Sequence, residues 1–99
     1  MNTTCYVAAI EWPTSHNAIY LKKLPYNEQQ EAVRYTHPER LRSFIASRLL
    51  LRRSLSLHEN RHLAWQFLRH NQRLILDKTQ TNLHTSLSHS QDWVACVLS

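Results

Sequence analysis

The chain has 99 residues, of which 42% are hydrophobic, and this size predicts one small globular domain spanning residues 1–99. Twelve Lys and Arg against seven Asp and Glu give a net charge of +5, and nine of the twelve are Arg, which favours an anionic partner. There is no glycine, so the glycine-rich phosphate loops of nucleotide-binding proteins are excluded.

Membrane and redox functions are not favoured. No apolar run reaches the roughly 20 residues that a membrane-spanning helix needs, and residues 1–10 lack the basic start of a secretion signal. We therefore expect a cytoplasmic protein without a membrane partner. Cys5 and Cys96 lie far apart in apolar runs without a neighbouring cysteine, which predicts two reduced core thiols rather than a zinc or redox site.

The first third of the chain predicts one strand and one short helix. Residues 4–12 alternate and are rich in Tyr, Val and Ile, which predicts a strand that ends at Pro13. Residues 28–34 are helix-forming and have acidic side chains in the first turn, and Asn27 is a candidate N-cap. We therefore expect a short helix from residue 28.

The clearest helix is predicted to begin at Pro38 and to run to about Leu57. Apolar residues recur every four positions, at Leu41, Ile45 and Leu49, as the buried face of a helix requires. One flank is strongly cationic, with Arg40, Arg42, Arg48, Arg52 and Arg53. This flank is either a solvated surface or a binding site for an anion.

The rest of the chain predicts strands. Residues 65–68 and 74–76 flank a turn at 71–72 and predict a hairpin, and residues 87–90 and 93–98 predict two further strands. Together the elements predict an α+β fold in which a small antiparallel sheet packs on one long helix. Because the chain ends directly after a strand, we expect one edge or face of the sheet to need a further covering element.

The most unusual segment places three hydroxyls and an imidazole directly before the last hydrophobic strand: Ser86-Leu87-Ser88-His89-Ser90. Strand alternation predicts the three serines on one face of the sheet, and Leu87 and His89 on the other. Taken alone, the segment is as consistent with a strand edge whose hydroxyls satisfy a turn as with a binding site.

Three segments, taken in order, resemble the first half of phosphopantetheinyl transferases of the two-lobed type, in the holo-acyl-carrier-protein synthase superfamily. They are residues 44–52 in the long helix, 65–67 before the hairpin turn and 87–94 in the last two strands. The resemblance implies one lobe of the family's pseudo-dimer. It also implies the family's reaction, in which phosphopantetheine passes from coenzyme A to a serine of an acyl or peptidyl carrier protein.

The resemblance further implies which residues bind coenzyme A. Ser88 and His89 match the Ser-His-Ser motif that holds the pyrophosphate. Arg40 and Arg48 match basic residues that bind the nucleotide end, including its ribose phosphate. Where the family has a phosphate-reaching lysine in a Gly-Lys-Pro turn, this chain has Asn71-Gln72-Arg73, so Arg73 is the nearest basic residue.

The resemblance ends before the family's Asp-x-Glu strand, which ligates magnesium, and before a later helix with further catalytic groups. It therefore implies no catalytic and no metal-binding residue in this chain, and magnesium only where a second lobe supplies its ligands. Three hypotheses remain open. The chain is a split or truncated transferase with a missing carboxy-terminal lobe, a non-catalytic coenzyme A-binding module or remnant that pairs with itself as a homodimer, or a small basic nucleic-acid-binding protein.

Overall fold

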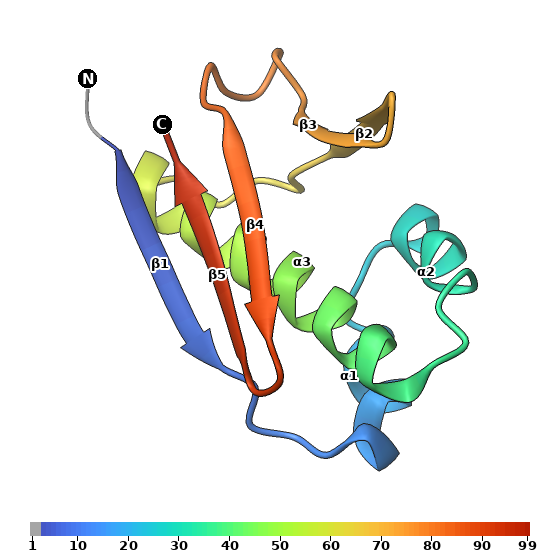
Figure 1. Ribbon diagram of the computed structural model, residues 1–99. Helices are drawn as coiled ribbons and strands as arrows, with labels where there is room; N and C mark the ends of the chain where they lie inside the picture. Colours follow the sequence, from blue (N-terminus) through green and yellow to red (C-terminus); the bar gives the residue numbers. More distant parts are fainter. Residues whose placement is uncertain (1–2) are drawn as a thin grey trace.

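The computed structural model describes residues 3–99. In chain order its elements are β1 (Thr4–Ala9), the 3₁₀ helix η1 (Thr14–His16), α1 (Asn17–Leu21), α2 (Tyr26–Ala32), α3 (Pro38–Glu59), β2 (Phe67–His70), β3 (Arg73–Leu76), β4 (Thr85–Ser90) and β5 (Trp93–Leu98). Strands β1, β5 and β4 form an antiparallel sheet against α3, and β2 and β3 form a separate hairpin (Figure 1). The predicted α+β class is confirmed.

The last strand, β5, is the centre of the sheet. Its neighbours are in antiparallel register with it, so that Cys96 lies opposite Tyr6 of β1 and opposite Leu87 of β4. Directly paired residues share a face of the sheet, and successive residues alternate between faces. Cys96 is fully buried against α3, which puts Leu87 and His89 on the helix-facing side, and Ser86, Ser88 and Ser90 on the opposite side, as predicted.

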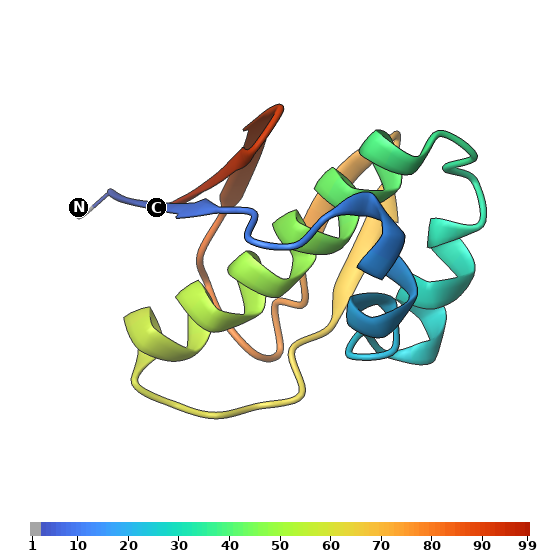
Figure 2. The same ribbon diagram turned by 90° about the horizontal axis from the view of Figure 1, so that it is seen from below.

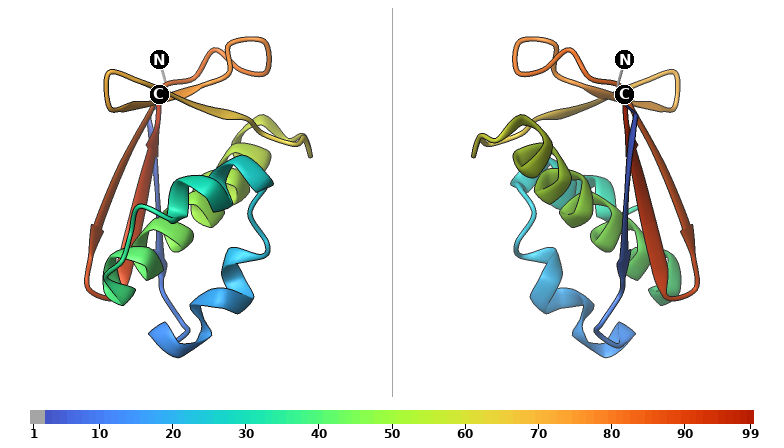
Figure 3. Two further views of the ribbon diagram at one scale, coloured as in Figure 1. Left: turned by 90° about the vertical axis from the view of Figure 1, so that its right-hand side faces the viewer. Right: turned by 90° about the vertical axis from the view of Figure 1, so that its left-hand side faces the viewer.

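Helix α3 is the middle layer of the molecule. It lies along one face of the sheet, and α1 and α2 pack on its far side (Figures 2 and 3). Leu51 and Leu55 of α3 are fully buried and pack with Leu98 of β5, whereas Ile45 packs with Leu24 and the helices on the other side. The predicted helix is confirmed and extends two residues further than expected, because Asn60 ends it in the left-handed conformation.

The hairpin is fixed to α3 through Trp65, which is 2% exposed. Its indole nitrogen donates to Ser56 Oγ at 2.9 Å, and Arg52 donates to its backbone oxygen at 3.2 Å. The predicted turn is confirmed, and Asn71 and Gln72 both have positive φ, at 50° and 64°. A two-residue turn of this kind matches the twist of the flanking strands, and here it forms without glycine.

The start of the chain differs from the prediction. Strand β1 ends at Ala9 because the guanidinium of Arg42 takes the backbone oxygens of Ile10, at 2.9 Å, and Trp12, at 2.6 Å, and thus turns the chain away from the sheet. Residues 14–21 then form η1 and α1, which no periodicity predicted. Helix α2 begins after Pro25 rather than at Asn27, since Pro25 occupies the N-cap position.

The outer face of the sheet is not covered by any element within residues 3–99 (Figure 3). Val7 of β1 is 60% exposed there, and Trp93 of β5 is 54% exposed. Cys5 is also exposed on this face, so the prediction of two core thiols holds only for Cys96. Within the same residues, no helix has the length and apolar character needed to cross a membrane.

Candidate functional site

A groove runs along the helix-facing side of β4, and we call it the β4 groove. Its helix end, about 730 Å³, lies between the start of α3 and the β4–β5 turn. Its middle, about 320 Å³, lies between α3 and β4. Its hairpin end, about 710 Å³, lies between the β2–β3 hairpin and β4. Adjacent parts share lining residues, Arg40, Ser43 and His89 at one junction and Arg69 and Leu87 at the other, so the three form one surface.

Three of the five predicted site residues meet in the middle of the groove. Arg40 lies in the first turn of α3, Arg48 two turns further along the same helix, and His89 on β4. Arg40 and His89 are exposed, so their donors can reach a ligand in the groove. The structure therefore brings together residues that are up to 49 positions apart in the sequence.

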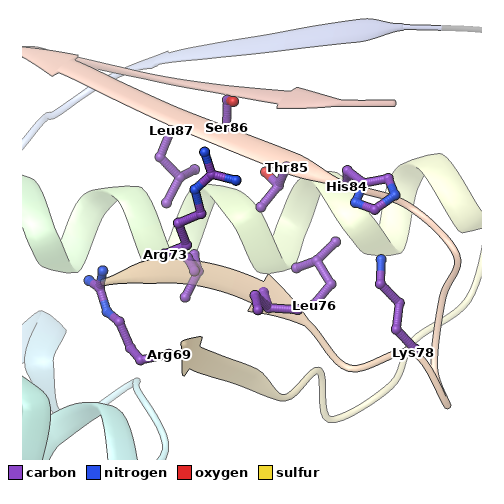
Figure 4. Close-up of a pocket in the computed structure, with 10 residues that line it drawn as sticks. Arg69, Arg73, Leu76, Lys78, His84, Thr85, Ser86 and Leu87 are labelled. Carbon is purple, nitrogen blue, oxygen red and sulfur yellow. The ribbon is translucent and has the colours of Figure 1, made fainter. Parts of the chain in front are cut away.

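Arg73 lies at the hairpin end, which Figure 4 shows in close-up. It extends from β3 toward Ser86 of β4, and Lys78 points toward His84 at the far side of the same hollow. Four basic side chains line this part, namely Arg69, Arg73, Lys78 and His84, and none of its lining residues is acidic. The hairpin end is thus suited to an anionic group.

Ser88 lies apart from the groove. Its side chain is on the outer face of the sheet, where it borders a shallow hollow with Val7, Trp93 and Ala95. Ser88 and His89 are adjacent in a strand, so their side chains point to opposite faces of the sheet. The structure brings His89 together with the arginines and does not bring the hydroxyl of Ser88 there.

Arg48 is a buried arginine whose charge is already paired. Its side chain is 2% exposed; Nη1 lies 3.2 Å from Glu28 Oε1, and Nη2 lies 3.0 Å from Glu31 Oε1. Glu28, which is 1% exposed, also accepts from Arg52. A buried charge is tolerated only when it is paired and hydrogen-bonded, so this cluster is a structural requirement of the fold. Arg48 forms part of the groove wall, with its guanidinium held by α2.

Arg42 is likewise structural. Its guanidinium donates to the backbone oxygens of Ile10 and Trp12, as described above. It also donates to Gln91 O at 3.1 Å and to Asp92 Oδ1 at 2.9 Å, and these contacts fix the β4–β5 turn. The flank that the sequence predicts to be uniformly cationic therefore contains arginines of two kinds. Arg42 and Arg48 are buried and paired, whereas Arg40 and Arg53 are exposed.

Arg69 is a groove residue that the sequence did not predict. It lines both the middle and the hairpin end, and its Nε lies 2.6 Å from Glu31 Oε1. Arg69 follows the buried Phe67 by two positions in β2, so strand alternation places both on the inner side of the hairpin. This two-residue spacing from Phe67 is the one feature of the sequence that could have placed Arg69 at the groove.

The carboxyl group of Glu31 is held in its ionised form. Its burial acts to raise its pKa, but the hydrogen bonds and positive charges of Arg69 and Arg48 together outweigh burial and lower the pKa. Glu31 is therefore a full negative charge at neutral pH, placed beside the most basic part of the groove.

The described residues do not fit a metal site. Within residues 3–99, no three His, Cys, Asp or Glu side chains gather where they could hold an ion. Magnesium therefore has no identifiable ligand set in this part of the chain, and we assign no chemical step to it.

The fold is similar to that of a solved holo-(acyl-carrier-protein) synthase, which agrees with the fold that the sequence resemblance implied. The structure matches the crystal structure of the holo-(acyl-carrier-protein) synthase from Bacillus anthracis str. Ames, determined in complex with CoA (3′,5′-ADP), with a TM-score of 0.67. The match covers 97% of this chain and 91% of that one, at 20% sequence identity, so the likeness is one of fold. No family model and no curated protein matches the sequence.

The pairing of Arg48 predicts a strong effect on stability. Arg48→Ala leaves Glu31 and Glu28 each without one partner, so we expect the free energy of unfolding to fall by about 3–5 kcal/mol. Arg53→Ala removes an exposed arginine from the same helix, and we expect a change within about 0.5 kcal/mol. Urea unfolding followed by circular dichroism measures both. Equal losses in the two variants would contradict the structural role of Arg48.

Proposed function

We propose that this chain is a coenzyme A-binding lobe of a phosphopantetheinyl transferase and that the β4 groove holds the phosphates of coenzyme A. The main support is that Arg40, Arg48 and His89, which the sequence resemblance implies as coenzyme A-binding residues, all line the middle of the groove. The fold adds independent support, because its solved counterpart is a synthase determined with this ligand.

The charge distribution suits a ligand with two separated anionic groups. Coenzyme A carries a pyrophosphate and a ribose phosphate. Arg40 and His89 offer donors in the middle of the groove, and Arg73 and Lys78 offer donors at the hairpin end. Charge-assisted hydrogen bonds from such groups are stronger than neutral ones and give both affinity and orientation.

In the proposed reaction, a carrier-protein serine oxygen bonds to the phosphorus that carries pantetheine. The bond from that phosphorus to the bridging oxygen breaks, 3′,5′-ADP leaves with the electron pair, and the serine proton passes to a base. The groove residues orient the pyrophosphate and stabilise the negative charge that develops on the leaving group. Within one copy, residues 3–99 gather no three His, Cys, Asp or Glu side chains that could hold an ion. In this proposal the base and any metal ligands are supplied by a second lobe or, in a homodimer, by the two copies together.

Calorimetric titration of the chain with coenzyme A tests this function. We expect saturable binding, and a loss of affinity of about tenfold or more in Arg40→Ala and in His89→Ala, since each removes a donor to a charged group. Arg53→Ala is the matched control, because Arg53 is exposed on the same helix but lines no part of the groove. Arg48→Ala is unsuitable because it also breaks the buried ion pairs.

Two further titrations separate the alternatives. Dephospho-coenzyme A measures what the ribose phosphate contributes, and a short DNA duplex tests the nucleic-acid hypothesis. Absence of coenzyme A binding, or an equal loss of affinity in the Arg53 variant, would contradict the proposed function. Tight binding of the duplex alone would favour a nucleic-acid-binding protein.

The outer face of the sheet supports a second proposal, that two copies of this chain pair through it. Val7 and Trp93 are largely exposed there, so the face is apolar over β1 and β5. The outward positions of β4 carry only serines, so the whole face is uncharged. A contiguous apolar face is typical of a protein interface. The solved synthase chain that matches over 91% of its length is of comparable size, which favours a second copy over a separate carboxy-terminal lobe.

Sedimentation equilibrium tests the homodimer. We expect a concentration-dependent dimer for the wild-type chain and a monomer for Val7→Lys, because a buried unpaired charge is costly at an interface. Val33→Lys is the matched control, since Val33 is 73% exposed but lies at the end of α2, away from the sheet. A wild-type chain that stays monomeric at millimolar concentration would exclude the homodimer.

A further inference from the structure

Two arginines that line the groove, Arg48 and Arg69, share one carboxylate. Oε1 of Glu31 lies 2.6 Å from Arg69 Nε and 3.0 Å from Arg48 Nη2. Arg69 borders both the middle of the groove and its hairpin end. An arginine that lines the most basic part of the groove is therefore already paired with an anion, which α2 supplies.

Glu31 differs from its neighbour Glu28 in one respect that matters for binding. Glu28 is 1% exposed and is paired with Arg48 and Arg52 deep in the fold, so it is fixed in place. Glu31 is 16% exposed and holds Arg69, whose side chain is 40% exposed. The pair between Glu31 and Arg69 can open without disturbing the buried pairs that anchor α2 to α3.

A phosphate that approaches Arg69 meets this carboxylate. The two anions would compete for the same guanidinium, because Arg69 Nε already donates to Glu31 and Nη1 donates to Gln72 O at 3.1 Å. Like charges at such short range repel, and the partly enclosed groove weakens solvent screening. Binding there requires that Glu31 release Arg69 and keep Arg48 as its partner.

We propose that Glu31 is an internal competitor that sets the affinity of the β4 groove for anions. A ligand phosphate occupies Arg69 only by displacing Glu31, so weakly charged anions are excluded and a phosphate of high charge is selected. This inference rests on the proposed function, since it assumes that the groove binds the phosphates of coenzyme A. Glu31 lies outside the three segments that resemble the family, and this proposal gives it a role in setting the affinity for the ligand.

Coenzyme A and 3′,5′-ADP titrations of Glu31→Gln test the competition. We expect about tenfold tighter binding than wild type, because the amide keeps the shape of the side chain and loses the competing charge. The same variant should be less stable in urea unfolding, since it weakens two ion pairs. A purely structural role for Glu31 predicts lower stability together with weaker binding, which is the opposite sign for the ligand.

Glu11→Gln is the matched control. It makes the same change in net charge at an exposed position, outside the groove and outside the ion pairs of the described residues. An equal gain in both variants would overturn the inference, because it would reflect total charge alone. If Glu31→Gln does not fold, Glu31→Asp keeps the charge but is one methylene shorter, and weaker contact with Arg69 should still tighten binding.

The outcomes distinguish the two proposals. Binding by the wild-type chain with no gain in Glu31→Gln would overturn the competition and leave the proposed function standing. Tighter binding by the variant, including binding that only the variant shows, supports the competition. No binding of coenzyme A or 3′,5′-ADP by either protein would overturn the proposed function and this inference with it.

Discussion

The buried ion pair between Arg48 and Glu28 is the constraint on which the rest of the structure depends. Both side chains are almost wholly excluded from solvent, so neither charge is tolerable without the other. The pair fixes α2 against α3, and Arg52 joins Glu28 to the backbone of Trp65, where the hairpin begins. Helix, hairpin and groove wall are therefore held in place by one charged cluster.

This cluster also explains why the groove can be basic and still stable. Exposed arginines supply donors to a ligand, while buried arginines repel one another unless carboxylates separate them. Glu28 and Glu31 from α2 provide that separation. The same carboxylates lower the net positive charge beside the groove, so the requirements of folding and of the proposed phosphate binding oppose each other at Glu31.

Local signals in the sequence predicted the elements whose stability is local. Pro38 and the four-residue spacing of Leu41, Ile45 and Leu49 were sufficient to predict α3. The turn at residues 71–72 was sufficient to predict the hairpin. Helix α1 was not predictable, because the side chain of Asn17 holds it by accepting from Trp12 Nε1 and donating to Pro38 O. The resemblance implied Arg40 and His89 as site residues, and both line the groove. It could not show that Arg48 is paired or that Arg69 lines the groove, since those contacts link distant residues.

A spectrum of the wild-type chain labelled with nitrogen-15, recorded while coenzyme A is added, tests the central claim most directly. That claim is that the β4 groove is the anion-binding surface. The account predicts shifts of the side-chain Nε–H signals of Arg40 and Arg69 and of the backbone amide of His89, with Val7 and Trp93 on the outer face unchanged. Shifts confined to the outer face, or none at millimolar ligand, would contradict it.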